Sequence, residues 1–183
     1  MADVLKLVVD DFISVNHYLG YTVRGRHAVS YKTQEAKVFQ KRFTEYVKEE
    51  VKKQGWLIDL SANQHYYVDA VFYFPRVDMD TNNYWKVAFD AITDSQVVWR
   101  DDNLACERVI KVMYDSKHPR IEYTIYKTDF IGVFDNREQL IEFEDKCTSC
   151  ARYKKNCSLL KGLKEGRCSD DVTSEYVCLK YKQ

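Results

Sequence analysis

The sequence gathers carboxylates between residues 78 and 102. Six aspartates fall in this stretch: Asp78, Asp80, Asp90, Asp94, Asp101 and Asp102. Like charges so close together repel one another unless a cation or a set of donors gathers them. Carboxylate oxygens are the hard ligands that Mg²⁺ or Mn²⁺ prefers, so the stretch is a candidate metal site. The alternative is a solvated acidic face, and composition alone leaves both open.

The aspartates stand at places where a fold can bring them together. Asp80 lies just before an expected helix, whereas Asp101 and Asp102 follow an expected short strand, Val97–Trp99. Carboxylates at such points can converge at one end of a sheet. One or two divalent ions held there would activate a water and stabilise the leaving oxygen of a phosphodiester.

Lys86 is expected to point at the same place, about one turn into the helix. An ammonium group there can stabilise negative charge on a phosphate in the transition state. Asp90 is four residues further on and therefore on the same helix face, where it is expected to hold Lys86 in position.

Cysteines form the second concentrated group. Five of the six follow residue 146: Cys147, Cys150, Cys157, Cys168 and Cys178. We expect a cytoplasmic protein, because no apolar run approaches a membrane span and MADVLKLVVDD lacks a signal-peptide pattern. Disulfides are rare in that compartment, which leaves metal binding as the reason to crowd thiols.

The C-x₂-C pair formed by Cys147 and Cys150 is typical of a structural zinc site, which Cys157 and Cys178 can complete. Cys168 can replace either of the later two, and the sequence leaves this open. The alternative is a set of free or oxidised thiols. Cys106 lies inside an expected strand, so we interpret it as a small apolar residue.

The elements that must position these residues follow from periodicity and turn signals. Expected strands cover 5–12, 66–74, 97–99, 105–114 and 120–126, and expected helices cover 33–54, 82–92 and 136–146. Apolar residues spaced by three and four indicate that the helix over 33–54 is amphipathic and ends at Gly55. The helix over 82–92 has Asn82 or Asn83 as its expected cap. Residues 16–31 are expected as a loop or an irregular hairpin.

This mixed order predicts an α+β domain over residues 1–128, with one mixed sheet and two main helices. Residues 129–146 are expected to be a connecting helix. Residues 147–183 are polar, so we expect a small module that needs zinc as a staple. The basic stretch from Ser14 to Trp56, with nine Lys and Arg against four Asp and Glu, suits a polyanionic partner. The alternative for its helical part is an ordinary solvated face.

The stretch DTNNYWKVAFDAI (80–92), followed by Asp101-Asp102, resembles the signature of the RusA family of Holliday-junction resolvases. That signature runs D-x-D-N-x-x-K-x-x-x-D-A-L, with a later D-D pair. The segment FISVN (12–16) with Tyr18 resembles the family's N-terminal S-x-N segment, and Tyr31 leads into a basic helix as in the family. The resemblance covers about residues 10–127.

The resemblance implies a homodimeric, Mg²⁺-dependent endonuclease that nicks four-way DNA junctions in pairs. Carried over by position, the catalytic set is Asp80, Asn82, Lys86, Asp101 and Asp102, and the Mg²⁺ or Mn²⁺ ligands are Asp80, Asn82 and Asp102. The expected DNA contacts are Asn16, Arg24, Arg26, Lys32 and Lys86.

The sequence departs from the family at one metal ligand. Asn82 stands where the signature has its second Asp, and an amide oxygen brings no charge to the metal. Asp78 supplies that charge in a register shifted by two residues, although the step to Lys86 is then two residues too long. A catalytically impaired protein that binds branched DNA is therefore the alternative function.

Overall fold

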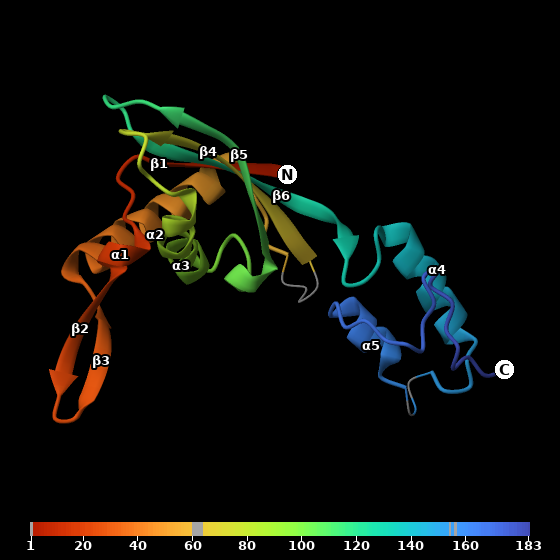
Figure 1. The fold of residues 1–183 in the computed structure, drawn as a ribbon. Helices are drawn as coiled ribbons and strands as arrows, with labels where there is room; N and C mark the ends of the chain where they lie inside the picture. Colours follow the sequence, from red (N-terminus) through yellow and green to blue (C-terminus); the bar gives the residue numbers. More distant parts are fainter. Residues whose placement is uncertain (1, 60–63, 154, 156) are drawn as a thin grey trace. The chain divides into compact units, whose positions relative to one another are not determined.

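The computed structural model describes residues 2–59, 64–153, 155 and 157–183 (Figure 1). It divides the chain into two units. The N-terminal unit comprises residues 1–60 and 66–126, and the C-terminal unit comprises residues 61–65 and 127–183. Among the described residues, no helix combines the length and apolar character needed to cross a membrane.

A four-stranded sheet forms the centre of the N-terminal unit. Its order is β1 (Val4–Val9), β6 (Arg120–Ile131), β4 (Gln64–Phe74) and β5 (Ala105–Tyr114). β1 runs antiparallel to β6, whereas β4 and β5 are parallel. The predicted α+β class with a mixed sheet is therefore confirmed, and the predicted bounds of β5 match the structure.

Two helices cover one face of this sheet. Side chains alternate along β4 because successive residues of a strand point to opposite faces; Val68, Ala70, Phe72 and their even-numbered neighbours are buried. α2 (Gln34–Gln54) packs against β1 and α3 (Trp85–Ser95). The apolar residues of α2 that the sequence pattern selects are buried: Ala36, Phe39, Phe43, Val47 and Val51.

Both ends of α2 follow local chemistry. The side chain of Thr33 accepts a hydrogen bond from the amide of Ala36 at 3.2 Å and so caps the first turn. Gly55 ends the helix with φ 70°, in the left-handed region that a residue without Cβ adopts at little cost. The predicted stop at this glycine is confirmed.

The segment before α2 is more regular than the sequence predicts. α1 (Val15–Tyr18) leads into a hairpin of β2 (Leu19–Arg24) and β3 (His27–Lys32) that extends away from the helices (Figure 1). Gly25 makes the turn with φ 63°. Most of the hairpin is exposed, so it offers little of the burial pattern from which strands are predicted.

Two local predictions around α3 are wrong. Val97–Trp99 is irregular rather than a strand, because its apolar side chains serve burial without a partner strand: Val98 and Trp99 are fully buried. Neither Asn82 nor Asn83 caps α3. A 3₁₀ turn, η1 (Thr81–Asn83), precedes that helix, and Asp80 caps this turn instead.

The C-terminal unit has its own small core. Phe134, Leu140, Phe143 and Leu163 are buried together. Of these, Leu163, on α5 (Leu159–Lys164), follows residue 146, and two others lie on α4 (Arg137–Thr148). Among the described residues, the cysteine-rich segment therefore adds one fully buried side chain to this core, whereas Leu159, Leu160, Val172 and Tyr176 pack against the core and are only partly buried. Gly132 is required at the edge of this core, since an added Cβ would lie 2.1 Å from the carbonyl oxygen of Leu163.

Candidate active site

Lys86 is held between two carboxylates. Its ammonium nitrogen lies 2.6 Å from Oδ1 of Asp90 and 3.2 Å from Oδ2 of Asp102. Hydrogen bonding to Asp90 is the main cause that raises the pKa of Lys86, so the side chain remains a cation. The lysine is 57% exposed, whereas Asp90 is 18% exposed. A half-exposed lysine that is paired with a partly buried carboxylate can contact a phosphate group that approaches from solvent.

Local structure accounts for this arrangement. Lys86 and Asp90 lie one turn apart on α3, the spacing that makes side chains neighbours on a helix. Asp102 begins a second 3₁₀ turn, η2 (Asp102–Leu104), and Asp101 caps this turn by accepting from the amide of Asn103 at 3.1 Å. The two residues of the predicted D-D pair therefore have different roles. Asp101 caps the turn η2, and Asp102, the first residue of this turn, contacts Lys86.

The other half of the motif lies before α3. Asp80 accepts a hydrogen bond from the amide of Asn82 at 3.0 Å, and both residues are exposed. Asp78 forms an ion pair with Arg76 at 2.8 Å, so part of its charge is already compensated. The shared turn keeps Asp80 and Asn82 together, and it does not include Asp78.

Two further residues reach this site without having been assigned there from the sequence. Tyr18 donates a hydrogen bond to Oδ2 of Asp90. Glu107, on β5, lies within the range of an electrostatic interaction with Asp102. Partial removal from water and then the charge of Asp102 raise the pKa of Glu107. Its place a few residues after the Asp-Asp pair, at the start of an expected strand, is the signal that could have identified it.

The predicted DNA contacts surround the hairpin. Arg24 and Arg26 lie at its tip, and Lys32 ends β3 at its base. Lys32 donates to Oε1 of Gln40 at 2.9 Å, so this lysine also secures the base of the hairpin on α2. Asn16 lies on α1, close in sequence to the same base.

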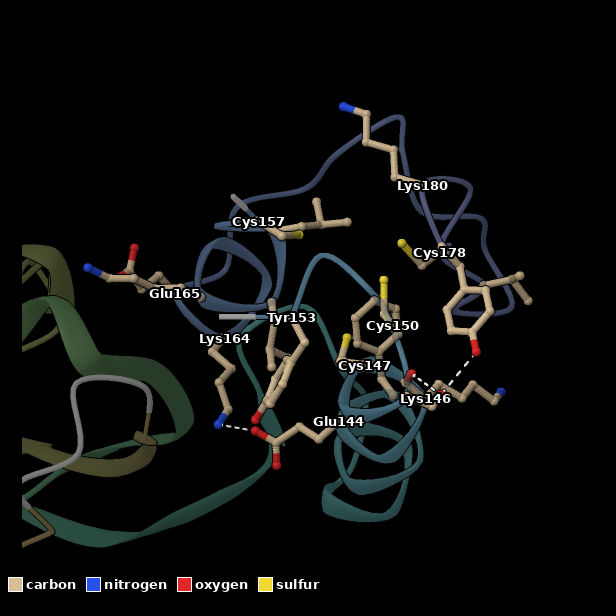
Figure 2. Close-up of a pocket in the computed structure, with 17 residues that line it drawn as sticks. Glu144, Lys146, Cys147, Cys150, Tyr153, Cys157, Lys164, Glu165, Cys178 and Lys180 are labelled. Carbon is tan, nitrogen blue, oxygen red and sulfur yellow. Dashed lines mark hydrogen bonds and ion pairs between the residues drawn. The ribbon is translucent and has the colours of Figure 1, made fainter. Parts of the chain in front are cut away.

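In the C-terminal unit, the four cysteines predicted as zinc ligands line one cavity of about 800 Å³. Figure 2 shows the labelled sulfur atoms of Cys147, Cys150, Cys157 and Cys178 turned into this space. Cys168 is not among the lining residues. Burial, followed by the neighbouring thiols, raises the pKa of Cys147 to about 11.

The residue types at both places fit metal ions. Asp80, Asp102 and the amide oxygen of Asn82 are hard oxygen donors, and four thiols are the soft donors of a structural zinc site. Over the described part of the chain, no three His, Cys, Asp or Glu side chains stand close enough to hold an ion as they are placed. A bound cation would have to draw the side chains at either place closer together.

Comparison with known proteins agrees with the motif. The family model described as Endodeoxyribonuclease RusA matches residues 20–126, more than half of the 183-residue chain. The match contains Asp80, Lys86 and Asp102, and it ends before α4 and the cysteine-lined cavity. No curated protein matches the chain significantly. The protein is thus a member of the RusA family of endodeoxyribonucleases.

Proposed function

We propose that the protein is a Mg²⁺-dependent endonuclease that resolves four-way DNA junctions by paired hydrolysis of phosphodiesters. The observation that carries this proposal is the arrangement of Lys86 between Asp90 and Asp102 inside the sequence that the family model matches. The lysine ammonium group can contact a negatively charged phosphodiester, and the neighbouring carboxylate of Asp102 can bind a divalent ion.

Each side chain has a separate part in this reaction. Asp80, Asn82 and Asp102 would hold the metal, for which Mn²⁺ is an alternative to Mg²⁺. A bound ion supplies an activated water and stabilises the leaving oxygen. Lys86 orients the scissile phosphate and offsets the charge that develops on it. Asp101 keeps η2 in the conformation that directs Asp102 toward Lys86.

Asn82 makes the metal site weaker than one with a third carboxylate, since it supplies oxygen without charge. The charge of Asp102 is a secondary cause that raises the pKa of Glu107, so this carboxyl group is the further oxygen donor that we propose to test beside Asp102. We therefore favour an active enzyme with a raised requirement for Mg²⁺. A branched-DNA-binding protein with impaired catalysis is the second candidate, and the observation in its favour is Asn82 itself.

The partner is branched DNA, and the active form is a homodimer. Arg24 and Arg26 at the tip of an exposed hairpin offer cations to the DNA backbone. Two symmetric cuts in one junction require two active sites, which two copies of this chain supply. Light scattering at micromolar concentration should give twice the mass of the 21.7 kDa chain.

The direct test is cleavage of a synthetic four-way junction, with linear duplex of the same sequence as control. Paired nicks that need Mg²⁺ and disappear in Lys86→Ala support the endonuclease. Binding of the junction without nicks at any Mg²⁺ or Mn²⁺ concentration supports the impaired protein instead. Equal affinity for junction and linear duplex, without cleavage, contradicts both candidates.

We also propose that the C-terminal unit holds one structural Zn²⁺ ion through Cys147, Cys150, Cys157 and Cys178. These cysteines share one cavity, and apart from Leu163 the described apolar residues after position 146 that pack against the core are only partly buried. Binding of Zn²⁺ can supply the missing free energy, on the order of 10 kcal/mol in zinc-finger peptides. Four thiolates leave no open position for water, so this ion takes no part in hydrolysis.

A further inference from the structure

A buried tyrosine connects the hairpin to the lysine of the active site. Tyr18 is 4% exposed at the end of α1, and its hydroxyl donates to Oδ2 of Asp90. The other oxygen of the same carboxylate, Oδ1, is the one that contacts Lys86 at 2.6 Å. Both oxygens of Asp90 are therefore engaged, one by the tyrosine and one by the lysine.

The same tyrosine is part of the hairpin base. It directly precedes β2, and its carbonyl accepts a hydrogen bond at 3.0 Å from the amide of Thr33, directly after β3. The ammonium of Lys32 lies over the Tyr18 ring, 5.2 Å from its centre. The two strands thus meet at Tyr18, and a movement of the hairpin base acts on its ring and hydroxyl.

We propose that Tyr18 is a positioning residue for Lys86, acting through Asp90, and that it couples the placement of the β2–β3 hairpin to the active site. This inference rests on the proposed function. A carboxylate held at one oxygen by a buried hydroxyl cannot rotate freely, so its second oxygen presents a fixed acceptor to Lys86. Without the hydroxyl, Asp90 can turn, and Lys86 is then directed mainly by Asp102.

Packing is the other role open to a buried tyrosine, and Tyr18→Phe separates the two because it keeps the ring and removes only the hydroxyl. We expect the single-turnover rate on a four-way junction to fall about ten-fold, which corresponds to the loss of a charge-assisted hydrogen bond. The junction dissociation constant should stay within about two-fold of wild type, since the hairpin cations Arg24 and Arg26 are unchanged.

Tyr46→Phe is the matched control. The hydroxyl of Tyr46, on α2, accepts a hydrogen bond from the amide of Val8 at 3.1 Å and has no link to Asp90. Tyr46→Phe loses the same atom and one hydrogen bond remote from Asp90, so this variant should cleave at the wild-type rate. A double-mutant cycle with Asp90→Asn completes the test, because Tyr18→Phe should add little to the loss that Asp90→Asn already causes.

Wild-type cleavage by Tyr18→Phe overturns the inference, as does a loss expressed entirely in junction affinity or a fully additive cycle. If Tyr18→Phe lowers the melting temperature, the cleavage rate of Asp90→Asn is used instead. A wild-type cleavage rate in Asp90→Asn also overturns the inference. A wild-type protein that binds the junction but never cuts it is a failure of the proposed function, with which this inference falls.

Discussion

At the residue scale, hydrogen bonds divide the acidic cluster into parts with different tasks. Asp80 and Asp101 each cap a 3₁₀ turn, whereas Asp90 and Asp102 contact Lys86. Asp78 is paired with Arg76. The six aspartates are therefore not a uniform acidic face, because hydrogen bonds and cations already compensate at least five of them.

Asp102→Asn should abolish cleavage and leave junction binding intact. The change removes a charged ligand of the proposed metal site. The cleavage rate should fall by more than about 100-fold, the upper range for residues that only hydrogen-bond to a metal ligand. Rates on a four-way junction in Mg²⁺, with affinity measured in Ca²⁺, check this. Asp3→Asn, an exposed aspartate just before β1, is the control. A variant that cuts at the wild-type rate would remove Asp102 from the metal site.

Asn82→Asp should lower the Mg²⁺ concentration needed for half-maximal cleavage by about ten-fold, since an added carboxylate strengthens a hard-cation site. The measurement is a Mg²⁺ titration of the cleavage rate. Asn83→Asp adds the same charge one residue away and should have a smaller effect. If Asn82→Asp instead slows cleavage and weakens the use of Mg²⁺, the alignment through Lys86 is wrong and Asp78 becomes the better candidate.

At the element scale, the β2–β3 hairpin buries little side-chain surface, because most of its residues are exposed. Tyr21 and Val23 are 74% and 72% exposed, and the cations of the tip lie beyond the core. Two hydrogen bonds hold the base of the hairpin on the core. One runs from Tyr18 to Asp90, and the other runs from Lys32 to Gln40. This combination of a fixed base and an exposed tip suits an arm that contacts a partner.

Replacing both Arg24 and Arg26 with Ala should weaken junction binding at least ten-fold at physiological salt. Each phosphate that the variant no longer neutralises should reduce the slope of log affinity against log salt by about 0.9. Binding titrations at several salt concentrations measure both. The control replaces Lys52 and Lys53, two basic residues at the opposite end of α2, and should change neither. An unchanged slope in the arginine variant would exclude the tip from the DNA interface.

At the scale of the whole molecule, the chain combines two units with different sources of stability. The N-terminal unit has a large apolar core around the sheet, from Leu5 and Phe72 to Trp99. Among its described residues, the C-terminal unit has four buried apolar side chains in its core and a cavity lined by thiols. A metal staple in the second unit would therefore affect its stability without changing the first.

Cys147→Ser should release zinc and make the C-terminal unit sensitive to protease, with residues 1–126 remaining folded. Cys168→Ser should do neither, because Cys168 lies outside the lining of the cavity. Elemental analysis and limited proteolysis of the full chain, purified without chelator, measure both effects. Protein without zinc, or zinc lost on replacing Cys168 and kept on replacing Cys157, would contradict the proposed ligand set.

Much of the fold and part of the candidate site could be predicted from the sequence, because they depend on neighbouring residues. The periodic apolar residues of α2 and the glycine that ends it are local signals, and so is the spacing that pairs Lys86 with Asp90. The prediction of a strand over Val97–Trp99 is wrong, since an apolar run does not distinguish a strand from an irregular buried segment.

Tertiary structure alone decided which distant side chains meet. Tyr18 and Asp90 are 72 positions apart, and Lys86 and Asp102 are 16 apart on different elements. No local pattern encodes such contacts, because they depend on how α1, α3 and η2 pack around the sheet. The sequence by itself determined the chemistry available, from the spacing of Asp, Asn and Lys to the set of thiols. Packing decided which carboxylates face Lys86, which ones cap turns, and which cysteines share a cavity.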